Sequence, residues 1–78
     1  MINEDVIIFL NTPLIAQESG GKTQTTIHKI KAKVLKEEGG GFVLQVKSLG
    51  NDKGWQEAPA SLKEIFLPTH KIDFAALL

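Results

Sequence analysis

The alternation of apolar and polar residues is clearest in the middle of the 78-residue chain. Lysines occupy every second position from 29 to 33, and apolar residues stand between them. This period of two puts the lysines on one face of a strand, whereas a helix would scatter them. Glycines follow at 39–41, and the alternation resumes at residue 42. The pattern therefore predicts a β-hairpin over residues 27–49. Its alternating positions are Lys29, Ile30, Lys31, Ala32, Lys33 and Val34.

The N-terminal part of the chain contains an uninterrupted apolar run at residues 6–10. Five β-favouring residues in a row predict a strand that is buried on both faces. We expect this strand to extend past a kink at Pro13. Residues 17–23 are polar and rich in glycine, which predicts a surface loop before the hairpin.

The C-terminal part of the chain alternates between turn residues and short apolar runs. Residues 50–54 form a dense turn signal, and Trp55 begins a short strand that residues 59–62 interrupt. A further strand follows and ends in a tight turn at Pro68, because proline lacks the N–H that a central strand needs. The last strand then runs to Leu78.

These elements together predict an all-β domain. No stretch is long enough for an amphipathic helix of about 12 residues. We therefore expect residues 1–78 to form a single small antiparallel barrel of five strands. Hydrophobic residues make up 42% of the chain and charged residues 23%, as in ordinary globular proteins, although so short a chain has only a small core.

Two motifs stand out in the second half of the chain, Gly54-Trp55-Gln56-Glu57-Ala58 and Leu67-Pro68-Thr69-His70-Lys71-Ile72. The first is similar to the tryptophan strand, and the second to the proline signature, of the Src-homology-3-like (SH3-like) small barrel, which this half of the chain therefore resembles. The resemblance covers about 25 residues and implies the SH3-like fold. It also implies a shallow protein-binding face marked by Trp55, Pro68 and His70. A non-enzymatic protein-interaction or accessory module is therefore our first expectation.

Two departures limit what this resemblance implies. The signalling members of the family bind proline-rich peptides in a groove lined by tyrosines, but this chain has no tyrosine, and Lys71 stands in the place of one. We therefore do not expect a typical proline-rich-peptide binder. The ending at residues 72–74 is also compatible with an Sm-like RNA-binding barrel, although the arginine-glycine and aspartate-asparagine signatures of that family are absent.

The charges bear on nucleic acid as an alternative partner. Nine lysines balance nine acidic residues, so a nucleic acid would have to bind a local basic patch. The chain has no arginine, and it therefore lacks the guanidinium group that forms bidentate hydrogen bonds to guanine. One such patch is a stripe formed by Lys29, Lys31, Lys33 and Lys36. It could follow a phosphodiester backbone. Glu37 and Glu38 lie beside it and no aromatic residue is interleaved, so a solvated outer face is the favoured interpretation.

Catalysis and metal binding find little support in the sequence. The only histidines are His28 and His70, and neither comes with the carboxylates that a metal site needs. His28 is therefore expected to be structural, and His70, in the turn after Pro68, could simply bond the backbone. Residues 16–23 fit a relaxed phosphate-loop pattern, but a strand follows where that loop requires a helix. We expect no enzyme activity and no cofactor. The absence of cysteine fits a reducing compartment, and the acidic N-terminus is unlike a secretory signal, so we expect a cytoplasmic protein without a membrane partner.

Two apolar features leave alternatives open. Trp55 is either a core residue or an exposed ligand platform. Residues 74–78 carry more apolar surface than one strand face can bury, so self-association or another protein is expected to cover them. A small structural subunit of a larger complex is a further alternative.

Overall fold

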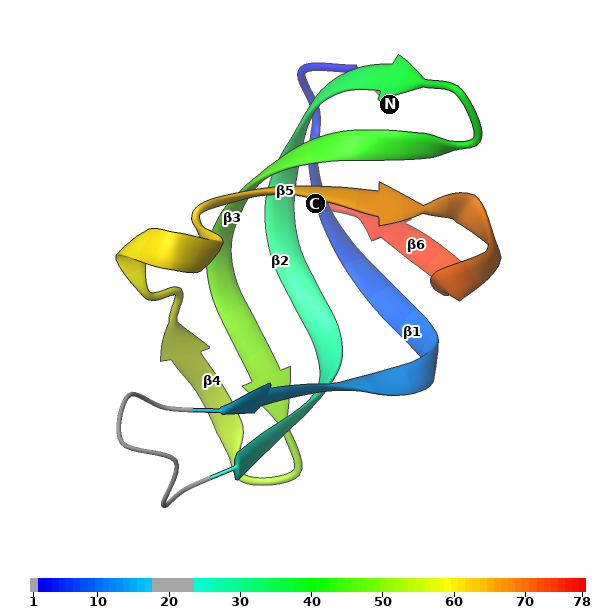
Figure 1. Cartoon of the computed structure of the whole chain (residues 1–78). Coiled ribbons are helices and arrows are strands. Elements are labelled where there is room, and N and C mark those ends of the chain that lie inside the picture. Colours follow the sequence, from blue (N-terminus) through cyan, green and yellow to red (C-terminus); the bar gives the residue numbers. More distant parts are fainter. Residues whose placement is uncertain (1, 18–23) are drawn as a thin grey trace.

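The computed structural model describes residues 2–17 and 24–78 of the chain. In that part it contains six strands and two 3₁₀ turns, and no α-helix (Figure 1). The strands are β1 (Asp5–Gln17), β2 (Gln24–Glu38), β3 (Gly41–Asn51), β4 (Gly54–Glu57), β5 (Glu64–Pro68) and β6 (Ile72–Leu77). The 3₁₀ turns are η1 (Ala60–Leu62) and η2 (Thr69–Lys71). The predicted surface loop lies largely at residues 18–23, outside the described residues.

All strand pairs are antiparallel, in the order β4-β3-β2-β1-β6. Strand β5 pairs with the first half of β3, whose second half pairs with β4. The prediction of five strands was therefore wrong by one, because β3 is long enough for two partners that η1 separates. No pairing in the described part joins β6 to β4 or β5. The all-β class is confirmed as an antiparallel sheet, but its strand pairing does not close into a barrel.

The central hairpin formed by β2 and β3 confirms the clearest sequence prediction. Gly39 and Gly40 make its turn with φ angles of +31° and +92°, a region that side chains with a Cβ rarely adopt. Ile30, Ala32 and Val34 are fully buried, as the alternation requires. The lysines between them therefore lie on the outer face of the sheet.

Strand β1 differs from its prediction on one point. Val6 and Ile8 are fully buried, but Ile7 and Phe9 are only half-buried. Burial on both faces was therefore wrong, because the sheet curls around the core and its outer side is only partly covered in the described part of the chain. The strand does continue past the proline, with a register shift between Phe9 and Leu14.

The core lies inside the curl of the sheet and is entirely apolar. Residues of β1, β2 and β3 supply most of the core. Ala58, directly after β4, and Leu67 of β5 complete it. No polar or charged residue is buried in the described part. Each fully buried aliphatic side chain contributes about 1.5–3 kcal/mol of transfer free energy, which is substantial for a chain of this length. The fully buried aliphatic residues of largest volume are Ile8, Ile30, Leu44, Val6 and Val34.

Candidate functional site

The register of the sheet places aromatic and basic residues in one row across its outer face. Phe74 of β6 is opposite Phe9 of β1, which is opposite Lys29 of β2. Lys29 is opposite Gly50 of β3, and Gly50 is opposite Trp55 of β4. Because alternate residues of β1 and β2 are buried, this row lies on the outer side of the sheet. We define the basic–aromatic face as Phe9, Lys29, Lys31, Lys33, Trp55 and Phe74.

Trp55 is held on this face by two lysines of β2. The Nζ atoms of Lys29 and Lys31 lie 4.9 and 4.8 Å from the centroid of the Trp55 ring. These distances are typical of cation–π contacts, and lysine stems cover apolar surface while their ammonium groups stay in water. Trp55 remains 38% exposed. Of the two alternatives, the core residue is therefore wrong, and the indole lies on the surface.

Gly50 makes the contact between Lys29 and Trp55 possible. A Cβ atom at this position would lie 2.4 Å from Cγ and 2.7 Å from Cε of Lys29. The stem of Lys29 therefore crosses β3 in the space that a side chain would occupy. This glycine serves the close approach of a neighbouring side chain, because its own φ is not in the left-handed region.

A second aromatic platform lies at the other end of the row. The rings of Phe9 and Phe74 stack with centroids 4.5 Å apart and an interplanar angle of 16°. Phe74 is 54% exposed. Three strand spacings separate Phe9 from Trp55, which is about 14 Å for an untwisted sheet. The lysines of β2 lie between the two platforms.

Two carboxylates beside this face are paired with lysines outside it. Asp5 accepts a hydrogen bond of 2.8 Å from Lys47, and Glu57 lies 3.6 Å from Lys63. The hydrogen bond from Lys47 is the main cause that holds the pKa of Asp5 below its usual value, and the nearby Lys33 adds to the effect. In the part of the chain that the structure describes, no carboxylate forms an ion pair with the two lysines on Trp55.

The predicted lysine stripe stays on one side of the sheet, but one of its members is paired with a carboxylate. Lys29, Lys31 and Lys33 share the outer face, and the register shift between Val34 and Lys36 places Lys36 opposite Val43, on the same side as Gln45, the partner of Lys33. Lys36 lies 2.9 Å from Glu38, and this hydrogen bond raises its pKa. The expectation that no aromatic residue is interleaved was wrong, because the aromatic residues come from neighbouring strands and not from β2.

The three residues of the predicted protein-binding face are not brought together. Trp55 pairs with Gly50 and Pro68 with Gly41, at opposite ends of β3. Gly41 and Gly50 are nine residue steps apart, which is about 30 Å along a strand. His70 lies exposed in η2, where its backbone carbonyl accepts a hydrogen bond of 2.6 Å from Asn11.

His28 is half-buried, and its Nε2 atom lies 3.4 Å from Oδ1 of Asp52. Among residues 2–17 and 24–78 no group of three or more histidine and carboxylate side chains is placed to hold a metal ion.

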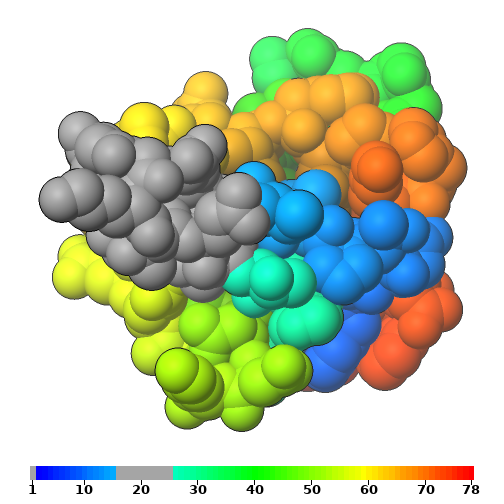
Figure 2. All heavy atoms as spheres, turned by 60° about the horizontal axis from the view of Figure 1, so that its bottom comes forward, coloured from blue at the N-terminus to red at the C-terminus, as the bar shows by residue number. Residues whose placement is uncertain are grey.

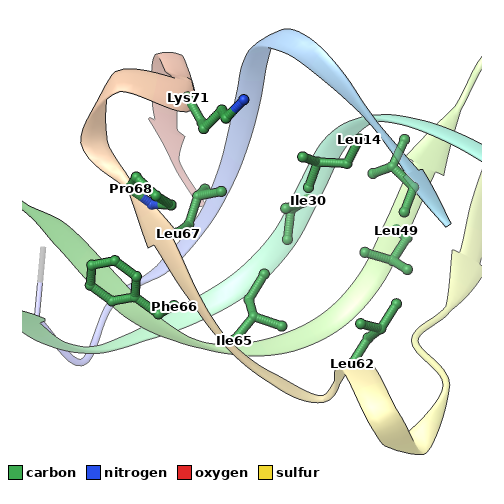
Figure 3. A pocket seen from close by; sticks show the side chains of 10 residues that line it. Leu14, Ile30, Leu49, Leu62, Ile65, Phe66, Leu67, Pro68 and Lys71 are labelled. Carbon is green, nitrogen blue, oxygen red and sulfur yellow. The ribbon is translucent and has the colours of Figure 1, made fainter.

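An apolar cleft of about 260 Å³ opens where β5 faces the bend of β1 (Figure 3). Figure 2 shows that end of the molecule, where the bend of β1 (blue) lies between the η2 segment (orange) and the start of β2 (cyan to green). Leu14, Ile65 and Leu67 point into the cleft, and Pro68 and Lys71 lie at its rim. Of the predicted protein-binding residues, only Pro68 belongs to it. Its remaining lining residues are Ile27, Ile30, Leu49, Leu62 and Phe66.

No protein-family model matches the chain, and neither the curated proteins nor the solved structures include a significant match. Within the described residues, no helix is long and apolar enough to cross a membrane.

Proposed function

We propose that this chain binds single-stranded nucleic acid on the basic–aromatic face. The observation that carries the proposal is the pair of lysines, Lys29 and Lys31, that lie on the exposed Trp55 ring without an ion-pair partner among the described residues. Two like charges held about an indole favour an anion between them, and the ring offers a stacking surface beside that anion.

The proposed binding mode follows from the order of groups along the row. Bases stack on Trp55 and on the Phe9–Phe74 pair, and the phosphates between them contact the lysines of β2. Base–aromatic stacking contributes about 1–3 kcal/mol per base and tolerates any sequence. The absence of arginine agrees with this mode, since bidentate recognition of base edges is not needed. Duplex DNA and RNA offer no unstacked bases and are expected to bind more weakly.

The experiment is a titration of a labelled single-stranded oligonucleotide, followed by fluorescence anisotropy over a range of salt concentrations. The variant replaces Lys29, Lys31 and Lys33 with glutamine. Since each phosphate contact on a single strand contributes about 0.7 to the slope of log K against log salt, the slope should become shallower by about 2. The matched control, Lys63→Gln combined with Lys71→Glu, carries the same change in net charge at positions outside the basic–aromatic face and should keep the slope.

The aromatic half of the proposal has its own variant. Trp55→Leu should weaken oligonucleotide binding by roughly 5- to 150-fold, in line with about 1–3 kcal/mol for one stacked base. Phe66→Leu is the control, because Phe66 is also exposed, at 49%, but lies on β5 away from the row. Equal binding by wild type and Trp55→Leu, or a salt slope near zero, contradicts the proposal.

The apolar cleft favours protein interaction as a second candidate function. Its lining is apolar except for Lys71, which suits an apolar side chain of a protein partner. This candidate retains Pro68 from the predicted protein-binding face but leaves out Trp55 and His70. A partner captured by the wild type and lost in Leu62→Glu, but retained in the triple Lys→Gln variant of β2, supports it over nucleic acid.

A further inference from the structure

The structure leaves three strands with an unpaired edge in its described part, and they differ in how that edge is protected. Strand β4 is only four residues long and ends at Glu57. Strand β5 begins with Glu64 and ends with Pro68. Short length, charge and proline are the usual devices that keep an edge from pairing with another chain. Strand β6 has six residues, no lysine and no proline, and Asp73 near its start is its only charge.

The register identifies which backbone groups of β6 face away from β1. Residues 76 and 77 of β6 are opposite residues 7 and 6 of β1, and the N–H of Leu78 donates to the carbonyl of Asp5 at 3.0 Å. Hydrogen-bonded and non-hydrogen-bonded pairs alternate in an antiparallel ladder. Phe74 and Ala76 therefore direct their N–H and C=O groups toward β1, and Ala75 and Leu77 direct theirs to the open edge.

We propose that β6 pairs with β6 of a second copy of this chain, antiparallel and centred on Ala76. An antiparallel pair of identical edges is self-complementary under a twofold axis, so the contact closes as a dimer. In this register each Ala75 lies opposite Leu77 of the other copy, and the two exchange N–H···O=C bonds in both directions. All the outward-facing groups derived above are then satisfied. The small Ala76 side chains meet at the centre, where they permit close approach.

Side chains and charge agree with this register. Phe74 lies opposite Leu78 of the other copy, and these residues are 54% and 68% exposed in the single chain. The pairing thus covers the apolar surplus of residues 74–78 that sequence analysis identified. In this register the two Asp73 residues lie about 20 Å apart along the strand direction, so like charges do not meet.

A consequence concerns the outer face of the sheet. The twofold axis of an antiparallel edge pair is perpendicular to the sheet, so the two basic–aromatic faces lie on the same side of one continuous sheet. The dimer itself does not depend on nucleic-acid binding, and it is tested without nucleic acid.

The test is analytical ultracentrifugation of the purified 78-residue chain over a wide concentration range. Wild type should show a reversible monomer–dimer equilibrium. Ala75→Pro removes an N–H that faces the open edge and none that bonds β1, so it should fold and be monomeric. Leu77→Lys places a charge on the same edge and gives a second, independent variant. Circular dichroism establishes that each variant is folded.

Phe66→Ser is the control for general apolar adhesion, because it removes an exposed aromatic ring far from β6 in the sheet order. It should dimerise like the wild type. A wild type that stays monomeric at high concentration overturns the proposal. So does a dimer that both Ala75→Pro and Leu77→Lys leave unchanged, or one that Phe66→Ser abolishes.

Discussion

The positive potential at Trp55 is measurable without any ligand, because Trp55 is the only tryptophan in the chain and its fluorescence reports on one place. The perturbation is the double variant Lys29→Gln and Lys31→Gln. Glutamine removes the charge and keeps a shorter, polar and flexible side chain at each position. Since the chain has a formal net charge of zero, no overall field competes with the local one.

The size of the effect follows from the geometry. An anion at the indole is near the two ammonium groups, which lie 4.8 and 4.9 Å from the ring centroid. In water each pair attracts by about 0.8 kcal/mol, and screening at 0.1 M salt reduces the sum to about 1 kcal/mol. This free energy corresponds to about a fivefold higher concentration of anions at the ring. Cations are depleted by a similar factor.

The assay compares quenching of Trp55 fluorescence by iodide and by caesium. Acrylamide is a neutral quencher, so it reports the accessibility of the Trp55 ring without any effect of charge. Relative to the value expected from that accessibility, the Stern–Volmer constant of the wild type should be several times larger for iodide and several times smaller for caesium. The double variant should bring both ions close to the acrylamide value. Lys63→Gln combined with Lys71→Gln is the control with the same change in net charge at positions outside the basic–aromatic face. Equal quenching by the two ions in the wild type refutes the placement of the lysines on Trp55.

Three further predictions concern the fold. Ile30→Ala should lower the free energy of unfolding by about 2–5 kcal/mol in urea titrations, because Ile30 is fully buried, whereas Ile15→Ala, at a residue that is 68% exposed, should change it little. Gly41→Ala should cost about 1–3 kcal/mol in the same assay, since its Cβ would lie 2.6 Å from the backbone carbonyl oxygen of Leu67. Asp5→Asn should be less stable than the wild type at neutral pH. The pKa of Asp5 is lower in the folded state than in the unfolded state, so the stability difference between wild type and variant should shrink as the pH falls below about 4. The difference should vanish below the pKa of Asp5 in the folded state, and thermal unfolding at several pH values measures it.

The hairpin could be predicted because its signals are local. The alternation from Lys29 to Val34 determines which side chains lie inside, and the glycines before Phe42 determine where the chain turns. The resulting burial follows from periodicity alone. The short strand at Trp55 and the turn after Pro68 were also identified, since turn residues bound them on both sides.

The basic–aromatic face could not be predicted, because it depends on pairing between strands. Lys29 reaches Trp55 only because both are opposite Gly50, and Phe9 joins them through a separate register. A bulge between Lys31 and Ala32 shifts the pairing of β2 with β3 by one residue. Such a shift moves every later residue relative to the neighbouring strand, and no sequence pattern within β2 announces it.

The separation of Trp55 from Pro68 has the same origin. Their spacing in sequence suggested one binding face, but β3 is long enough to pair with β4 and β5 at different ends. Distance along the chain between two short strands therefore said little about their distance in space. The open edge of β6 is likewise a property of the sheet order, which only the assembled fold defines.

Chemical-shift mapping tests the central claim most directly. In a ¹H–¹⁵N titration with a short single-stranded oligonucleotide, the account predicts the largest shifts at Phe9, Lys29, Lys31, Trp55 and Phe74, with the Trp55 indole N–H among them. A saturating titration that leaves these signals unmoved, or that moves only those of η2 and the apolar cleft, contradicts it.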